Sequence, residues 1–340
     1  LIAKRGGYAG LYTTGTEAPN VANPHSHIWD SDRTPLDVQL RRTEAVLQKI
    51  RTLLAPGSKT VTSLGELEQQ FRKLARTAAS IAQSDDESAR NAEKELYIRL
   101  RQLNRKIVLS NPLLDFDDLI FNRWTSSYGH VQECWGTTVL DDGGLYVLSG
   151  IRGEQPRLRN VLQDSRFSNG PWKGKRILGL GKAIRSFDLS YDGTKVVFAW
   201  IHRRFRKHRI ATVNTDGSEL HLLTDGQYED LDPVWLPNGR IAFVSTRPEI
   251  TVRCNNSDTT RQCVMYSMKA DGSDVVRISF HETNERYPTV DNNGMLSYMR
   301  WDYIDRDFSA AHNLWRCFPD GRDPRSPHGN YPFPHGSWST

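Results

Sequence analysis

The chain has 340 residues, with 45 basic and 40 acidic side chains and a formal net charge of +5. This length is enough for two domains, and the small positive excess does not argue for nucleic acid binding. No apolar run is long enough to predict a membrane span. The densest basic run, residues 202–209, is predicted to be a solvated hairpin tip, and an anion contact is the alternative.

Residues 1–33 are rich in Gly, Thr, Pro and Asn without periodicity, and they are predicted to form an extended lead-in. Residues 34–110 instead carry apolar side chains three and four positions apart, which indicates helices with one buried face. Ser63 and Glu66 have the spacing of a capping box, which predicts a helix start there. We expect an α-helical hairpin or three-helix spacer, with a partner-binding coiled coil as the alternative. The side chains predicted to point inward are Leu40, Leu47, Leu67, Phe71, Leu74, Leu96, Leu100 and Leu103.

Residues 111–340 change to short strand patterns separated by turns that contain glycine. The repeat is marked by two interleaved series, of which the first is Gly193, Gly239 and Gly294 and the second is Gly217, Gly272 and Gly321. Two hairpins per repeat make a four-stranded sheet, so the pattern predicts a mainly β fold, a β-propeller with about four visible blades. We expect further blades in a longer protein. The predicted turn residues are Asp192, Asp216, Asn238, Asp271, Asn293 and Asp320.

A family resemblance is carried by four longer strings, at residues 111–117, 232–241, 279–285 and 300–306. They resemble the middle domain of the hydrazine synthase alpha subunit and its bacterial relatives, and the Asp-Gly repeats resemble those of TolB-like propellers. The resemblance implies an exported bacterial multidomain protein, periplasmic or extracellular, with about six or seven blades. In hydrazine synthase that subunit carries c-type haem. This chain has no Cys-x-x-Cys-His, so covalent haem attachment within it is not predicted.

The residues that the repeat does not require are candidates for a ligand site. Loops after equivalent strands leave one face of a propeller, so we expect these side chains to surround the channel mouth. Their types suit a polar ligand or a divalent metal, and the alternative is a set of hydrogen bonds and salt bridges between blades. A second candidate is the pair His130 and Cys134, in a long insertion. The channel-mouth candidates are His281, Glu282, Glu285, Arg300, Asp302, Asp305 and His312.

These features predict a non-catalytic binding or scaffold module, whose partners are proteins or other domains of the same polypeptide. The alternative is part of a hydrazine-synthase-like redox enzyme, in which the propeller houses a haem or metal site supplied with other domains. A third hypothesis, the propeller cap of a serine peptidase, needs a Gly-x-Ser-x-Gly motif that this chain lacks. Cofactor and catalysis stay open at this stage. Cys254 and Cys263 flank a polar loop that a disulfide would close in an oxidising compartment.

Overall fold

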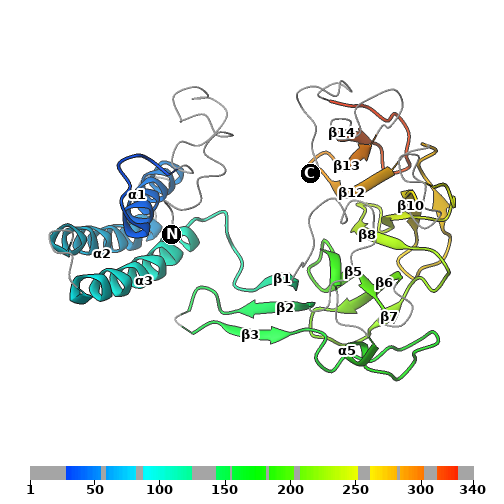
Figure 1. Ribbon diagram of the computed structural model, residues 1–340, viewed down its shortest axis with the longest axis horizontal. Helices are drawn as coiled ribbons and strands as arrows, with labels where there is room; N and C mark the ends of the chain where they lie inside the picture. The colour runs from blue at the N-terminus through cyan, green and yellow to red at the C-terminus, as the bar shows by residue number, and fades with distance from the viewer. Residues whose placement is uncertain are drawn as a thin grey trace. The chain divides into compact units, whose positions relative to one another are not determined.

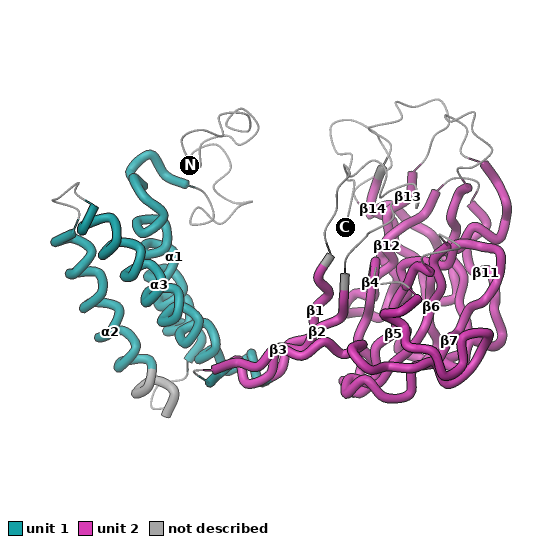
Figure 2. Tube along the Cα trace, turned by 60° about the horizontal axis from the view of Figure 1, so that its bottom comes forward, with its two compact units in different colours: residues 1–117, 152–154 teal, residues 118–151, 155–340 magenta. Residues whose placement is uncertain are grey.

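The computed structural model describes residues 28–54, 59–81, 87–124, 143–153, 155–180, 184–202, 207–251, 261–281, 284–301 and 312–327. The chain divides into two compact units, which are coloured separately in Figure 2. The helical unit contains residues 1–117 and 152–154, and the β unit contains residues 118–151 and 155–340.

The helical unit consists of three helices around one apolar core (Figure 1). All the side chains that the sequence predicts to point inward belong to this core, with Leu40 and Leu67 as half-buried members. Full burial of such a side chain contributes about 1.5–3 kcal/mol, so packing of the stripes, rather than intrinsic propensity, holds the helices. Among the described residues, no helix combines the length and the apolar character needed to cross a bilayer. The helices are α1 (Pro35–Leu53), α2 (Lys59–Ile81) and α3 (Glu87–Leu109).

The start of α2 corrects the sequence prediction. This helix begins at Lys59, so Ser63 lies inside it and not at its N-cap. A capping box is present at α1 instead. The Thr34 hydroxyl accepts a hydrogen bond from the Asp37 amide, and the Asp37 carboxylate accepts one from the Thr34 amide at 3.0 Å. Pro35 follows at the first helical position, where its missing amide proton costs no hydrogen bond.

The β unit is mainly antiparallel sheet, in four successive sheets that we number I to IV (Figure 1). Sheet I contains β1 (Leu119–Trp124), β2 (Gly143–Ser149) and β3 (Arg157–Asn160). Sheet II contains β4 (Ile184–Leu189), β5 (Lys195–Ile201), β6 (His208–Asn214) and β7 (His221–Leu222). Sheet III contains β8 (Asp230–Trp235), β9 (Ile241–Ser245), β10 (Val264–Met268) and β11 (Val276–Arg277). Sheet IV contains β12 (Asn284–Val290), β13 (Leu296–Trp301) and β14 (His312–Cys317), and the short helix α5 (Ile177–Leu180) precedes sheet II.

The apolar core lies between consecutive sheets, because successive residues of a strand point to opposite faces. In β5, Val196, Phe198 and Trp200 belong to the cluster shared with sheet I, whereas Val197 belongs to the cluster shared with sheet III. A third cluster joins sheets III and IV. Strands β4, β8 and β12, which we call the first strands, contact one another in succession. The sheets therefore stack face to face with their first strands side by side.

Sheet I differs from the others at its first strand. In sheets II and III the second strand contacts the first strand of the next sheet, as β5 contacts β8 and β9 contacts β12. β1 contacts β4 in the same way, so it occupies the place of a second strand. Among the described residues, no strand pairs with its other edge. The string 111–117 follows α3 as turn and irregular chain. The first sheet therefore has a second, a third and a fourth strand, without a described first strand.

The two glycine series have different structural roles. Gly239 and Gly272 both have a positive φ, 79° and 86°, in hairpin turns of sheet III. A Cβ added at Gly239 would meet nothing within 4 Å, whereas one at Gly272 would lie 2.6 Å from the Leu223 carbonyl oxygen of sheet II. Gly217 and Gly321 likewise face a backbone carbonyl of the preceding sheet. The second series therefore allows neighbouring sheets to approach closely, in addition to making the turn.

Candidate functional site

The two ends of sheets II to IV differ in chemistry. One end, which we call the turn end, holds the Asp-Gly and Asn-Gly turns at 190–194, 215–218, 236–240, 269–273, 291–295 and 318–322. The opposite end, which we call the polar end, is where the first strands begin, the second strands finish and the third strands begin. It contains residues 184–186, 200–202, 207–209, 229–232, 245–247, 263–264, 284–287, 300–301 and 312–313.

The carboxylates at the turn end have structural roles, which confirms the sequence prediction. Asp216 accepts a hydrogen bond from the Ser218 amide at 2.8 Å, and Asp271 accepts the equivalent one from Ser273 at 2.9 Å. Hydrogen bonds from Ser190 and Thr194 lower the pKa of the exposed Asp192 carboxyl to about 2. Each acid completes its own turn, so none of these groups is placed for acid–base work.

At the polar end, three equivalent residues of the first strands form a chain of contacts. The Asp232 amide donates to the Ser186 hydroxyl at 3.1 Å, and the Tyr287 amide donates to the Asp232 carboxylate at 3.5 Å. Asp232 and Tyr287 have positive φ values of 50° and 53°, and both lie where the strand register shifts. Such backbone costs about 1–3 kcal/mol for residues other than glycine, and a bulge re-aims the side chain that it carries. The strained backbone therefore lowers the folding stability of the first strands and in return sets the direction of the side chains at these positions.

The Asp232 carboxylate lies between two arginines of the neighbouring sheets. Arg185 Nε is 3.7 Å from Oδ1, and an Arg286 guanidinium nitrogen is 3.7 Å from Oδ2. These distances are those of ion pairs and exceed a hydrogen bond. All three side chains are almost completely buried. Buried charges are costly unless they are paired, so sheets II, III and IV are coupled electrostatically at this point.

His208 adds a titratable group to this cluster. Its Nδ1 is 2.7 Å from the Glu229 carboxylate, which also accepts the His208 backbone amide at 3.0 Å. Because a carboxylate only accepts, Nδ1 carries the proton. Burial lowers the pKa of His208, and the positive charges of Arg185 and Arg286 lower it further against the raising effect of Glu229. His208 is therefore neutral in the folded protein at physiological pH.

Cys263 occupies the same place in sheet III that His208 occupies in sheet II. His208 precedes Gly217 in the sequence by the same interval by which Cys263 precedes Gly272. The Cys263 amide donates to the Asn284 side chain at 2.9 Å, as the His208 amide donates to a carboxylate. Burial raises the pKa of the Cys263 thiol to about 11, so it stays protonated and is a poor nucleophile.

Two further ion pairs belong to the polar end. Glu285 is fully buried and lies 3.0 Å from the guanidinium of Arg300, and it also accepts the Met265 amide at 3.2 Å. Asp230, equally buried, pairs with Arg247. Burial raises the pKa of Asp230 in spite of the nearby Arg247. Each pair joins a first strand to its own second strand or the segment after it, so these two salt bridges lie within a sheet, whereas the alternative considered from the sequence placed them between blades.

The structure describes some of the ligand-site candidates that the sequence predicts. Glu285 and Arg300 are brought together, and His281 lies half-buried in the connection before β12. His312 begins β14, at the position equivalent to His208 and Cys263. Outside the described residues lie Glu282, Asp302, Asp305, His130, Cys134 and Cys254. Cys263 is a buried free thiol here, and its pairing with Cys254 stays a prediction.

Sequence reasoning missed the cluster around Asp232. The signal was available, because Ser186, Asp232 and Tyr287 have the same spacing along the chain as the first glycine series. That spacing places Arg185 and Arg286 at equivalent positions of sheets II and IV. The cluster offers guanidinium, carboxylate and imidazole groups, which can hold a polar partner by charge and hydrogen bonds. Within the described part of the chain, no three His, Cys, Asp or Glu side chains are close enough to hold a metal ion.

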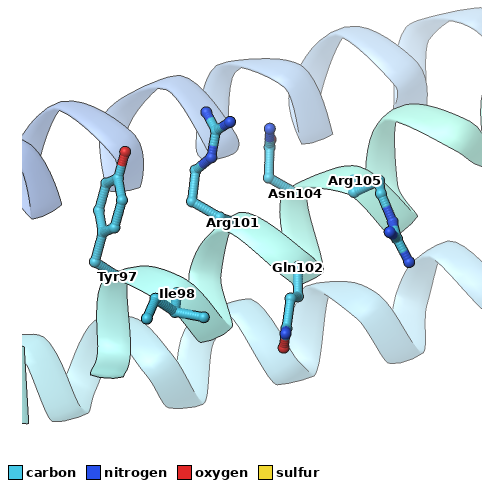
Figure 3. A pocket seen from close by; sticks show the side chains of 6 residues that line it. All are labelled: Tyr97, Ile98, Arg101, Gln102, Asn104 and Arg105. Atoms are coloured by element: carbon cyan, nitrogen blue, oxygen red, sulfur yellow. The ribbon is translucent and has the colours of Figure 1, made fainter. Parts of the chain in front are cut away.

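The helical unit carries a hollow of about 500 Å³ on α3, shown in Figure 3. Tyr97, Arg101 and Asn104 point to one side of the helix and Gln102 to the other. Arg101 donates to the Gln39 side chain of α1 at 3.4 Å. The hollow is wide and shallow, and its polar groups come from one helix, so it lacks the convergent polar groups of a small-molecule site.

The chain is similar to several solved structures at low sequence identity. No protein-family profile and no curated protein matches the chain. Three similar solved structures are TolB from Agrobacterium tumefaciens (18% identity, TM-score 0.40), hydrazine synthase from Kuenenia stuttgartiensis (12%, 0.48) and the β-propeller domain of the Trilobed protease from Pyrococcus furiosus (8%, 0.36). These matches cover 54%, 63% and 64% of this chain, and 56%, 32% and 55% of those chains. The neighbours are thus TolB-like and propeller proteins at low identity, and no function follows from them.

Proposed function

We propose that the β unit is an arc of TolB-like propeller blades that serves as a binding or scaffold module of a larger exported bacterial protein. We further propose that the polar end is its binding face, for a protein partner or for another domain of the same polypeptide. The observation that carries this proposal is the difference between the two ends. The acids of the Asp-Gly turns are satisfied within their own turns, whereas the buried charged side chains and histidines of the β unit gather at the polar end. Groups whose pKa is perturbed by burial and nearby charges, as those of His208 and Asp230 are, cluster at functional sites.

Hydrogen exchange tests where the face lies. Amide exchange is measured on this 340-residue chain and on the product of the complete gene. Binding at the polar end slows exchange in peptides covering 207–209 and 228–232 of the longer protein, whereas turn peptides such as 269–273 exchange equally in both. Protection confined to the turn end, or equal exchange everywhere, contradicts the proposal. If the complete gene encodes only these residues, the part of the proposal that concerns a larger protein is wrong.

Export and the redox alternative have separate tests. Peptide mapping without reduction of protein isolated from its natural host should find Cys254 joined to Cys263, and two free thiols would argue against an oxidising compartment. The redox alternative is supported by the sequence resemblance alone. Titration with hemin tests it, because a saturable Soret shift at one equivalent would favour a haem site over the scaffold function.

A further inference from the structure

One segment of the β unit, residues 155–176, is rich in basic side chains. Residues 155–176 contain six basic side chains and one acidic side chain, Asp164, so they carry a net charge of +5. The rest of the chain contains equal numbers of basic and acidic side chains and sums to zero. The basic residues, which we call the basic patch, are Arg157, Arg159, Arg166, Lys173, Lys175 and Arg176, and all are exposed.

The patch is presented on ordered backbone. Arg157 and Arg159 belong to β3, and the chain from 166 to 176 folds back on itself through the antiparallel bridge between Arg166 and Arg176. Phe167 and Trp172 are buried beneath this hairpin in the core shared by sheets I and II. The cations therefore project from a ribbon that the core anchors.

Three of the arginines are oriented by backbone carbonyls, and one of the three, Arg176, also pairs with an acid. Arg159 donates to the Thr215 carbonyl at 2.8 Å, Arg166 to the Gly174 carbonyl at 2.9 Å, and Arg176 to the Gln163 carbonyl at 2.8 Å. A carbonyl carries no net charge, so these bonds fix the guanidinium groups and keep their full charge. Asp164 pairs with Arg176 and is the single acid of the segment. Fixed guanidinium groups lose little entropy when they bind carboxylates in a forked geometry.

The side chains and the strand edge around the basic patch indicate which kind of anionic ligand it fits. The two aromatic side chains of the segment, Phe167 and Trp172, are buried, so it offers no stacking surface for single-stranded nucleic acid. Its one exposed large hydrophobic side chain, Leu158, is too little to anchor a membrane surface. In contrast, β3 is an edge strand that pairs with β2 alone among the described strands. An extended peptide can add to such an edge.

We propose that the basic patch binds an acidic, extended segment of a partner protein, laid along the edge of β3. Arg157 and Arg159 lie two residues apart, so they face the same side and are about 6.6–6.8 Å apart along the strand. A partner strand with Glu or Asp at every second position places its carboxylates at the same interval. The lysines of the hairpin then meet the carboxylates beyond the strand. This surface is separate from the polar end, because Arg159 contacts the turn 215–218 at the turn end.

The test uses a fluorescein-labelled peptide of alternating glutamate and threonine, titrated with the whole chain and followed by anisotropy. The Lys173→Glu/Lys175→Glu variant should weaken binding at least about tenfold, because each exchange removes an attraction and adds a repulsion. The matched control, Lys94→Glu/Arg99→Glu on α3, makes the same charge change on two exposed residues and should stay within about twofold. Arg157→Glu, an exposed change on β3, should also weaken binding.

Four outcomes overturn the proposal. They are the absence of peptide binding at about 50 mM salt, an equal loss in the control variant, an unchanged affinity in both patch variants, and tighter binding to duplex DNA or to anionic vesicles than to the peptide. Circular dichroism of each variant confirms that the fold is retained, so that a loss reports on the surface.

Discussion

The neutral, buried imidazole of His208 makes a prediction about acid stability. Its pKa is lowered in the folded protein, so the unfolded chain binds the proton more readily. The stability that this group contributes is complete above its unfolded pKa of about 6.5 and is lost as the pH falls toward the folded value. If the folded imidazole stays neutral, the loss between about pH 7.5 and 5.0 amounts to about 2 kcal/mol from this side chain alone.

The variant that isolates the effect is His208→Asn. An asparagine amide can donate to Glu229 from nearly the position of Nδ1, but it does not titrate. Removal of the buried ring should cost about 1–2 kcal/mol at pH 7.5, and the variant should lose about 2 kcal/mol less than the wild type on acidification. The two proteins therefore approach equal stability near pH 5.

Urea unfolding followed by tryptophan fluorescence measures the free energy at each pH, and the difference between the two curves removes the other titrating groups. His221→Asn is the matched control, because this histidine lies at the surface edge of sheet II and is only partly buried. Parallel pH curves for wild type and His208→Asn would refute the reasoning, since they would mean that His208 is protonated to the same extent in both states.

Three further outcomes are expected. Gly272→Ala should destabilise the protein by about 1–3 kcal/mol more than Gly239→Ala, because both strain a positive φ but only the first meets a backbone oxygen; equal melting temperatures would contradict this. Glu285→Gln should cost about 3–5 kcal/mol in urea unfolding, because it leaves Arg300 buried without its carboxylate; a loss below about 1 kcal/mol would mean that the pair is solvated. Reduced Cys263 should resist iodoacetamide at pH 8 until the protein is denatured, as peptide mass spectrometry would show, and rapid labelling of the native protein would exclude its burial.

Local chemistry explains what could be predicted from the sequence. A helix stripe or a turn depends on residues within a few positions of one another, so Leu100 in a stripe and Asp216 before a glycine were predicted correctly. The local signal failed where two structures share one pattern. Ser63 and Glu66 have capping-box spacing, yet that spacing also fits the interior of a helix, where α2 places them.

The candidate site depended on contacts between distant segments. The buried carboxylate of Asp232 is paired with Arg185 and Arg286, which belong to other repeats of the sequence. In space, a side-chain nitrogen of each arginine lies 3.7 Å from a carboxylate oxygen of Asp232. No local pattern marks such a group as buried or paired. Glu285 shows the same limit, because the sequence allowed either a ligand site or a salt bridge and the packing of β12 against β13 decided that it pairs with Arg300.

The sequence by itself determined the repeat, the turns and the helical stripes, because each arises from conformational preferences of adjacent residues and from periodic burial. Only the tertiary structure decided which charges are buried together and which stay exposed. His208 and Arg166 are both basic side chains on β segments of the same unit, yet one is sealed between sheets and the other projects from a hairpin. The physical reason is that the desolvation and pairing of a charge depend on the sheets stacked against it, and that stacking joins residues from different repeats of the chain.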